Sequence, residues 1–382
     1  PSRGLGDVYK RQVLALCLTA ACFACTEVEP EPVPPEPEVV YGLPAPAIGH
    51  YITNADLLED AGTRYLTYTT NEESGEEDNV IAVRKATFTE GEDKGWAYGD
   101  EQIVLRGDSA SWDRFIGSAS IVKGEFALGD KTYSWLMAYC ATAQTTEAQY
   151  QIGLAVAETP DGTWTKVSDR PIVAFDGDVY GATSVGCYAP SLVNLNRQSV
   201  VRVFYTYADM YGHFAKFVDL NAADLAKLYT EEAENDYTLI SGTVQLPTNG
   251  NISGGDAETM FPNADFVYDA ENAKVYAVKD YSPSAGTRPM FAEKLELTAI
   301  AEEELYTAEL KTGWQSVRLW DMTDTPDMAF ERLYSASAVS DAYGQLLDAS
   351  RMEIVYNVCE VAADNADWMF TQKLLTFEVE LN

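Results

Sequence analysis

The stretch that decides the fold reads Tyr188-Ala189-Pro190-Ser191-Leu192-Val193, followed after a turn by Val200-Val201-Arg202-Val203-Phe204-Tyr205-Thr206-Tyr207. At its centre is a tetrapeptide that consists of a small residue, then Asp or Ser, then two apolar residues. Four more copies occur, at Ala55-Asp56-Leu57-Leu58, Ala119-Ser120-Ile121-Val122, Ala264-Asp265-Phe266-Val267 and Ala336-Ser337-Ala338-Val339. From each Asp or Ser position to the next, the intervals are 64, 71, 74 and 72 residues.

A β-branched and aromatic run follows every copy, as in TRYLTYTT, TYSWLMAY, SVVRVFYTY, AKVYAVKDY and SRMEIVYNV. Such runs, bounded by Gly, Asp and Asn, predict strands, and a repeat of this length indicates repeated supersecondary units. We therefore predict an all-β fold, a five-bladed β-propeller that occupies residues 41–382 as one domain. The last unit has room for three strands only. We expect Glu38-Val39-Val40-Tyr41 to supply its missing outer strand and close the ring.

The beginning of the chain predicts export. Residues 1–25 are interpreted as an artefactual leader, PSRGLGDVYKRQ, followed by a signal peptide. The apolar segment VLALCLTAACFA is shorter than the ~20 residues that span a bilayer, and it follows a basic pair, which is typical of a secretory signal. Cys22 and Cys25 each end a stretch similar to the lipoprotein cleavage box, so one of them is expected to carry the lipid. An ordinary cleaved signal is the alternative.

Beyond the signal, the composition indicates an extracellular setting. Residues 26–40 are rich in Pro and Glu and predict an extended linker. The net charge of −34 and the pI of about 4.2 argue against a nucleic-acid partner, because phosphates bind Lys and Arg. We expect a lipoprotein at the outer membrane or cell surface that touches the membrane through its anchor alone.

The remaining cysteines and the two histidines point away from thiol, metal and cofactor chemistry. Cys140, Cys187 and Cys359 are an odd number at wide spacing, which gives no disulfide framework. A catalytic thiol needs a His partner, and the chain has only His50 and His213. We expect Cys140 and Cys359 to be buried thiols, and we expect neither a metal nor a cofactor.

Three segments resemble glycoside hydrolase family 43 and related propeller families. These segments are IGLAVAETPDGTWTKVSDRPIV, CYAPSLV and SWDRFIGSASIV. The resemblance implies a five-bladed propeller that hydrolyses glycosidic bonds in a polysaccharide or oligosaccharide. That chemistry requires a general acid and a base on either side of the bond.

The family's carboxylate positions are only partly retained. The resemblance places the family's base at Asn54 and its modulating Asp at Ala189, and neither side chain can take a proton from water. Asp56 lies two residues beyond Asn54 and therefore on the same strand face. Asp113 offers another base, and Glu258 lies where the family keeps its acid. The alternatives are that Asp56 only bonds backbone amides within the repeat and that Asp113 caps a turn.

The residues just before each tetrapeptide are expected to line one mouth of the central channel. Amides, Arg and Tyr in such a mouth suit sugar hydroxyls and ring faces. The predicted substrate-binding residues are His50, Asn54, Arg114, Tyr188, Asn263, Arg332 and Tyr334. Two functions stay open. One is a hydrolase with Glu258 as the acid and Asp56 or Asp113 as the base; the other is a non-catalytic glycan-binding propeller that has lost this pair.

Overall fold

The computed structural model describes residues 40–76, 78–91, 94–145, 148–177, 185–209, 212–230, 244–245, 260–281, 294–306, 314–321, 324, 332–360 and 368–381. Val39–Asn382 form one compact unit, and it contains all of these residues. The predicted signal, both lipidation candidates and almost all of the linker lie outside the described residues.

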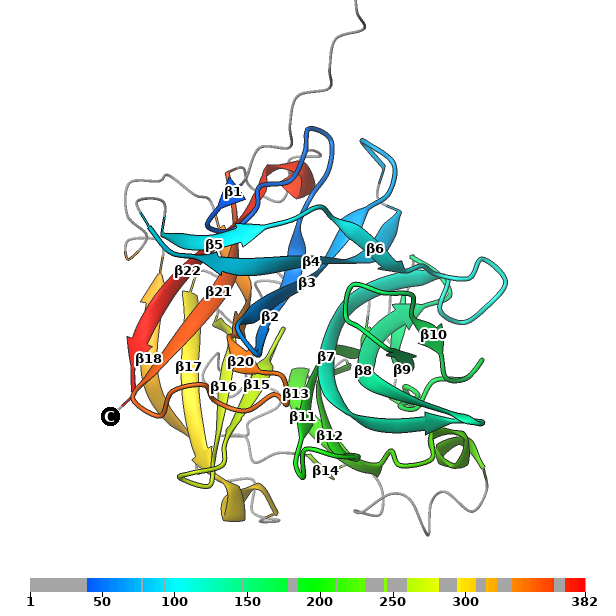
Figure 1. Ribbon diagram of the computed structural model, residues 1–382. Helices are drawn as coiled ribbons and strands as arrows, with labels where there is room; N and C mark the ends of the chain where they lie inside the picture. Colours follow the sequence, from blue (N-terminus) through cyan, green and yellow to red (C-terminus); the bar gives the residue numbers. More distant parts are fainter. Residues whose placement is uncertain are drawn as a thin grey trace, which may run out of the picture. The chain divides into compact units, whose positions relative to one another are not determined.

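Within the described residues the strands follow one another in five antiparallel meanders. Figure 1 shows them as twisted sheets, the first in blue and cyan and the fourth in yellow. The first contains β2 (Thr53–Asp60), β3 (Thr63–Asn71), β4 (Asn79–Thr89), β5 (Gly95–Tyr98) and β6 (Gln102–Leu105). The second contains β7 (Phe115–Leu128), β8 (Lys131–Thr142), β9 (Gln149–Ala157) and β10 (Thr165–Lys166). The third contains β11 (Val185–Asn194), β12 (Val200–Asp209), β13 (Gly212–Asn221) and β14 (Val244–Gln245).

The fourth meander contains β15 (Asp265–Asp269), β16 (Lys274–Tyr281), β17 (Lys294–Ala301) and β18 (Gln315–Asp321). The fifth contains β19 (Arg332–Ala338), β21 (Arg351–Cys359) and β22 (Gln372–Glu380). Short 3-10 helices are η1 (Leu225–Tyr229), η3 (Glu302–Tyr306) and η5 (Trp368–Thr371). No helix among the described residues is long and apolar enough to cross a membrane.

The second strand of each meander is largely buried on both faces because both faces are covered. In β3, for example, every residue from Leu66 to Asn71 is buried. The hydrophobic core is divided into clusters, each of which packs between two neighbouring meanders. Representative pairs, from the first interface to the one that joins the fifth meander to the first, are Leu58 with Ile116, Leu136 with Val203, Phe204 with Phe266, Val278 with Ile354, and Leu57 with Val355. The packing order of the meanders is therefore cyclic.

The Asp or Ser of each tetrapeptide bonds to the next copy, and we call these five residues the inner ring. Four of them accept a hydrogen bond from the backbone N–H that follows the corresponding residue of the next copy, and the fifth, Ser337, donates from its hydroxyl to Asp56. Asp56 accepts from Ile121 N, Ser120 Oγ from Leu192 N (3.1 Å), Ser191 Oγ from Phe266 N (2.9 Å) and Asp265 Oδ2 from Ala338 N (2.9 Å). Ser337 Oγ donates to Asp56 Oδ1 (3.4 Å). The repeated tetrapeptide thus links the inner strands in sequence.

Residues 340–346, which we call the closing segment, cross the inner strands just beyond this ring. The segment begins with β20 (Ser340–Asp341), which pairs in parallel with β2. Its next three carbonyls accept from equivalent positions in the other meanders: Ala342 O from Lys123 N (2.7 Å), Tyr343 O from Asn194 N (2.9 Å) and Gly344 O from Tyr268 N (3.1 Å). Gly344 has a φ of +72°, and an added Cβ would lie 2.1 Å from Leu192 O. Glycine is therefore required at this crossing.

The predicted closure by the N-terminal strand is not confirmed. β1 (Val40–Tyr41) pairs antiparallel with β5 and not with β22. It thereby covers the outer edge of the first meander, whose backbone groups would otherwise lack partners. By hydrogen bonding the strands form four sheets, because β9 also pairs in parallel with β11 and joins the second and third meanders.

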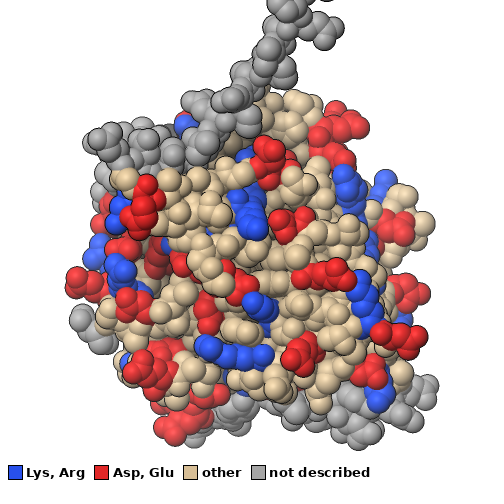
Figure 2. All heavy atoms as spheres, in the orientation of Figure 1, with Lys and Arg blue, Asp and Glu red and all other residues tan. Residues whose placement is uncertain are grey.

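The expectation of buried thiols is confirmed. Cys140 and Cys359 are buried and free, and so is Cys187. Burial raises the pKa of Cys187 to about 12 and that of Cys359 to about 11. On the surface, Figure 2 shows acidic and basic side chains interspersed over the face in view, as expected of a solvated exterior.

Candidate functional site

A strained corner precedes the inner ring in four of the five copies. Asn54, Ala189, Asn263 and Ser335 have φ values of 51°, 47°, 48° and 48°, and each lies two residues before its ring residue. In three of these copies the strand register shifts across the corner, as in a β-bulge. Left-handed conformations are costly for Ala and Ser and are concentrated at functional sites. The shared geometry shows that Asn54 and Ala189 are structurally equivalent.

The corners of the first, fourth and fifth copies meet in one polar network, the corner cluster. Its members are Asn54, Asn263, Asp280, Ser335 and Asn357. Ser335 Oγ donates to Asn54 Oδ1 (2.8 Å), and the Ser335 N–H donates to Asp280 Oδ1 (2.7 Å). Asn263 Nδ2 donates to Asp280 Oδ2 (2.6 Å), and the Asn54 N–H donates to Asn357 Oδ1 (3.2 Å).

Asp280 is the acidic centre of this cluster. It is 1% exposed, and burial raises the pKa of its carboxyl to about 7. Sequence reasoning missed it because it closes the apolar second-strand run AKVYAVKDY of the fourth copy. An Asp at the end of such a run was the available signal, because a buried carboxyl requires partners.

Two tyrosines lie beside the cluster. Tyr188 OH is 2.5 Å from His213 Nδ1, and Tyr334 OH is 3.1 Å from Thr53 Oγ1. Burial raises the pKa of both phenols, and the nearby charge of Asp280 adds to the effect. Burial lowers the pKa of His213 to about 4, so this ring is neutral near pH 7. The site thus offers amide, phenol and imidazole groups that can exchange hydrogen bonds with hydroxyls.

The predicted catalytic carboxylates do not gather at the corner cluster. Asp56 belongs to the inner ring, where burial and the charge of Asp265 raise its pKa. Asp113 is buried in the second meander, 2.5 Å from Lys166 Nζ and 2.9 Å from Tyr139 OH. Asp56 therefore makes the backbone bond that its alternative interpretation requires, whereas Asp113 bonds two side chains and not the backbone of a turn. Glu258 lies outside the described residues.

The other predicted binding residues divide into two groups. The structure brings Asn54 and Asn263 together in the corner cluster, with Tyr188 and Tyr334 beside them. Of the remaining three, Arg332 lies close to Tyr334, and Arg114 and His50 are elsewhere. Arg114 is exposed and lies 4.8 Å from the Phe115 ring; Arg332 is buried 5.3 Å from the Trp368 ring; and His50 Nδ1 bonds Asn71 O (3.1 Å) beside a separate cavity. Across the described ranges, no three His, Cys, Asp or Glu side chains are arranged to hold a metal ion.

No protein-family model and no curated protein matches the chain. Solved structures do match. A GH43_1 enzyme from Xanthomonas citri has 8% sequence identity and a TM-score of 0.52, with 87% of this chain and 89% of that chain covered. The same enzyme complexed with xylotriose also gives a TM-score of 0.52, at 8% identity, with 87% and 88% of the two chains covered. An alpha-L-arabinofuranosidase from Lactobacillus brevis has 12% identity and a TM-score of 0.50, with 85% and 90% covered. The all-β fold is therefore similar to that of family 43 glycoside hydrolases.

Proposed function

We propose that this chain is an exported, carbohydrate-active propeller of the family 43 type that binds a glycan without the family's acid–base hydrolysis. The observation that carries the proposal is the pair of equivalent corners at Asn54 and Ala189. The family resemblance assigns the base and the modulating carboxylate to these positions. An amide and a methyl group occupy them, and neither can activate water.

Five blades are the simplest interpretation of the repeat. Support comes from the five meanders, from the cyclic order of their core clusters and from the inner ring that links the copies in turn. The closing segment spans the inner strands at one end, which leaves the corner cluster facing the other end. A mouth on that side would present the cluster and its tyrosines to a ligand.

The chemistry of the corner cluster suits a neutral sugar. Its half-buried amides, Asn54 and Asn263, lie beside the half-buried Tyr188 phenol and the neutral His213 imidazole, and its one carboxyl holds its proton up to a pH of about 7. Such groups donate to and accept from hydroxyls without requiring a charged ligand. The polysaccharide classes to test are arabinan, xylan, fructan and mannan.

Affinity electrophoresis against these four polysaccharides tests the proposal. We expect retardation in at least one gel and no release of reducing sugar. Tyr188→Phe should weaken binding about 3- to 10-fold, the value of one neutral hydrogen bond. Tyr268→Phe is the matched control, because Tyr268 OH bonds Glu302 (2.7 Å) away from the corner cluster. Equal retardation of wild type and Tyr188→Phe would place the glycan elsewhere.

Hydrolysis is the second candidate, and Asp280 favours it. A buried carboxyl with a pKa raised to about 7 has the property of a general acid, and Glu258 provides another acid at the family's position. Release of sugar that is lost in Glu258→Gln or Asp280→Asn, with affinity retained, would establish an enzyme and refute the non-catalytic assignment.

The location is proposed on the sequence alone. Lipidation at Cys22 or Cys25 would hold the domain at the outer membrane or cell surface through the linker. Mass spectrometry of the membrane fraction should find a diacylglyceryl cysteine at one of these positions. A soluble chain that begins at Thr26 would reject the anchor and leave export intact.

A further inference from the structure

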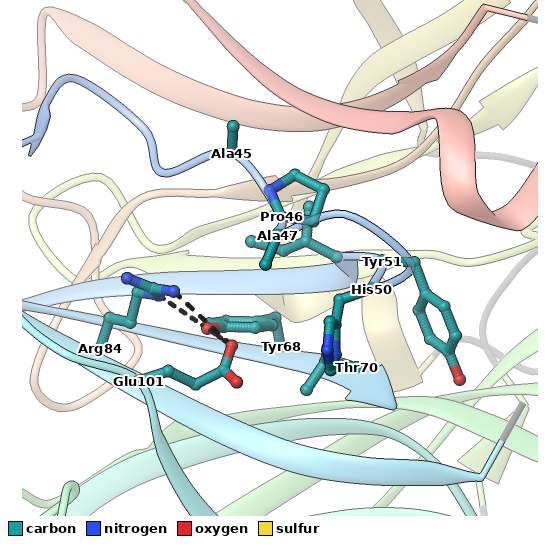
Figure 3. Close-up of a pocket in the computed structure, with 10 residues that line it drawn as sticks. Ala45, Pro46, Ala47, His50, Tyr51, Tyr68, Thr70, Arg84 and Glu101 are labelled. Carbon is teal, nitrogen blue, oxygen red and sulfur yellow. Dashed lines mark hydrogen bonds and ion pairs between the residues drawn. The ribbon is translucent and has the colours of Figure 1, made fainter. Parts of the chain in front are cut away.

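A small cavity lies in the first meander and shares no lining residue with the corner cluster. Figure 3 shows its walls, formed by strands β3 and β4, by Glu101 and by the chain from Ala45 to Ile52. Its volume is about 80 Å³, which corresponds to two or three waters at ~30 Å³ each. Such a space is too small for a whole sugar ring, but it can accept one edge of a ring.

One wall of the cavity is a fixed array of three polar side chains. Arg84 Nε donates to Tyr68 OH (2.9 Å), and Tyr68 OH donates to the Glu101 carboxylate. Arg84 and Glu101 also form an ion pair at 3.7 Å, with their side chains 21% and 30% exposed. The array is neutral overall, so it favours neither an anion nor a cation. It remains open enough to be reached from solvent.

The other wall offers two groups with unused hydrogen-bonding capacity. Thr70 is 1% exposed, and its Oγ1 has no hydrogen-bond partner among the described residues. His50 Nδ1 lies 3.1 Å from the carbonyl oxygen of Asn71. Because a carbonyl only accepts, Nδ1 is the donor, and in the uncharged imidazole tautomer with this donor the lone pair lies on Nε2. A buried hydroxyl without a partner is costly and indicates that something polar belongs in the cavity.

We propose that this cavity binds two adjacent hydroxyl groups of a neutral sugar. One hydroxyl would accept from the Thr70 hydroxyl and donate to His50 Nε2, and its neighbour would accept from the Arg84 guanidinium and donate to the Glu101 carboxylate. The apolar walls, Ala45 to Ala47 and the two tyrosines, would contact the C–H groups between them. The choice of a sugar rests on the proposed glycan binding, whereas the preference for a neutral diol rests on the cavity itself.

The two histidines of the chain allow both sites to be observed at once. His50 lines this cavity, and His213 bonds Tyr188 beside the corner cluster. The chain has no other histidine, so protein labelled with [13C]histidine and expressed without a histidine tag gives two ring signals. Single substitutions of each His by Gln assign them. Titration with L-arabinose, D-xylose, D-fructose and D-mannose then reports each site separately.

At least one of these sugars should shift the His50 signal saturably. Thr70→Val should weaken that binding about 3- to 10-fold, because one neutral hydrogen bond is lost. Thr67→Val is the matched control. Thr67 lies in the same strand with an equally unpartnered and buried hydroxyl, but it lies three positions away and therefore on the opposite face. The Thr67→Val variant should bind the sugar with the affinity of wild type.

The outcomes separate this inference from the proposed function. A shift of His213 alone would overturn the cavity site and support the corner cluster. A shift of His50 alone that is sensitive to Thr70→Val would support the cavity and count against the corner cluster. A His50 shift that Thr70→Val leaves unchanged, or no His50 shift with any of the sugars, would overturn the cavity site.

Discussion

Removing the carboxyl of Asp280 should make the protein more stable at alkaline pH. Asp280 is buried within the corner cluster, and burial raises its pKa from 3.8 to about 7. Below both values the folded and unfolded chains are protonated alike. As the pH rises, the unfolded chain releases the proton first, so the free energy of unfolding decreases until the pH passes the folded value.

The size of this effect follows from the two pKa values. Each pH unit between them costs about 1.4 kcal/mol, so the change between pH 5 and pH 7 is about 3 kcal/mol and the whole change is about 4 kcal/mol. Asp280→Asn keeps an acceptor for the Ser335 N–H but cannot ionise. The stability of the variant relative to wild type should therefore rise by about 3 kcal/mol from pH 5 to pH 7.

Urea unfolding followed by tryptophan fluorescence at pH 5, 6, 7 and 8 measures this difference. The pKa values of Asp56 and Asp265 are also raised, but both residues are present in wild type and in Asp280→Asn, so their contributions to the difference in stability cancel. Asp100→Asn, at an exposed position, is the matched control and should show no such trend. A constant offset between wild type and Asp280→Asn across this pH range would refute the reasoning.

Three further predictions concern the scaffold. Gly344→Ala should destabilise the protein by about 2–4 kcal/mol, because the added Cβ would meet Leu192 O. In the control Gly129→Ala the added Cβ meets nothing within 4 Å, so this variant should lose only the left-handed backbone penalty of about 1–2 kcal/mol. Equal losses of stability in urea unfolding would contradict the role of the closing segment. Asp219→Asn should cost about 3–5 kcal/mol because it leaves Arg202 buried without its carboxylate partner at 2.6 Å, and a loss below about 1 kcal/mol would show that water reaches the pair. Cys140, Cys187 and Cys359 should resist iodoacetamide at pH 8 in the folded protein and react in urea, because all three are buried; labelled peptides from the folded protein would refute this.

The sequence contained most of the strand pattern. The runs that follow each tetrapeptide became the second strands β3, β8, β12, β16 and β21. They were readable because both faces of these strands are buried, which produces continuous apolar and aromatic runs. The repeated Asp or Ser was also readable, although its purpose, the inner ring, became evident only from contacts between copies some 70 residues apart.

Features that depend on packing between distant residues were not readable. The pairing of β1 with β5 and the course of the closing segment depend on which edge is free in three dimensions. Asp280 joined the site because the turn before β15 and strand β19 place Asn263 and Ser335 against it. Asp113 was predicted as a candidate base, but in the structure it forms an ion pair with Lys166 in the second meander. These partners are distant in the sequence, so the local sequence pattern does not predict them.

The most direct test of glycan binding without hydrolysis is a single NMR experiment. Protein labelled with [13C]histidine is incubated with oligosaccharides of arabinan, xylan, fructan and mannan, and the His213 signal and the anomeric protons of the sugars are recorded together. We predict that one oligosaccharide shifts His213 saturably while its anomeric signals stay unchanged. The appearance of new reducing-end signals that depend on the protein, or a His213 signal unmoved by every oligosaccharide, would contradict the account.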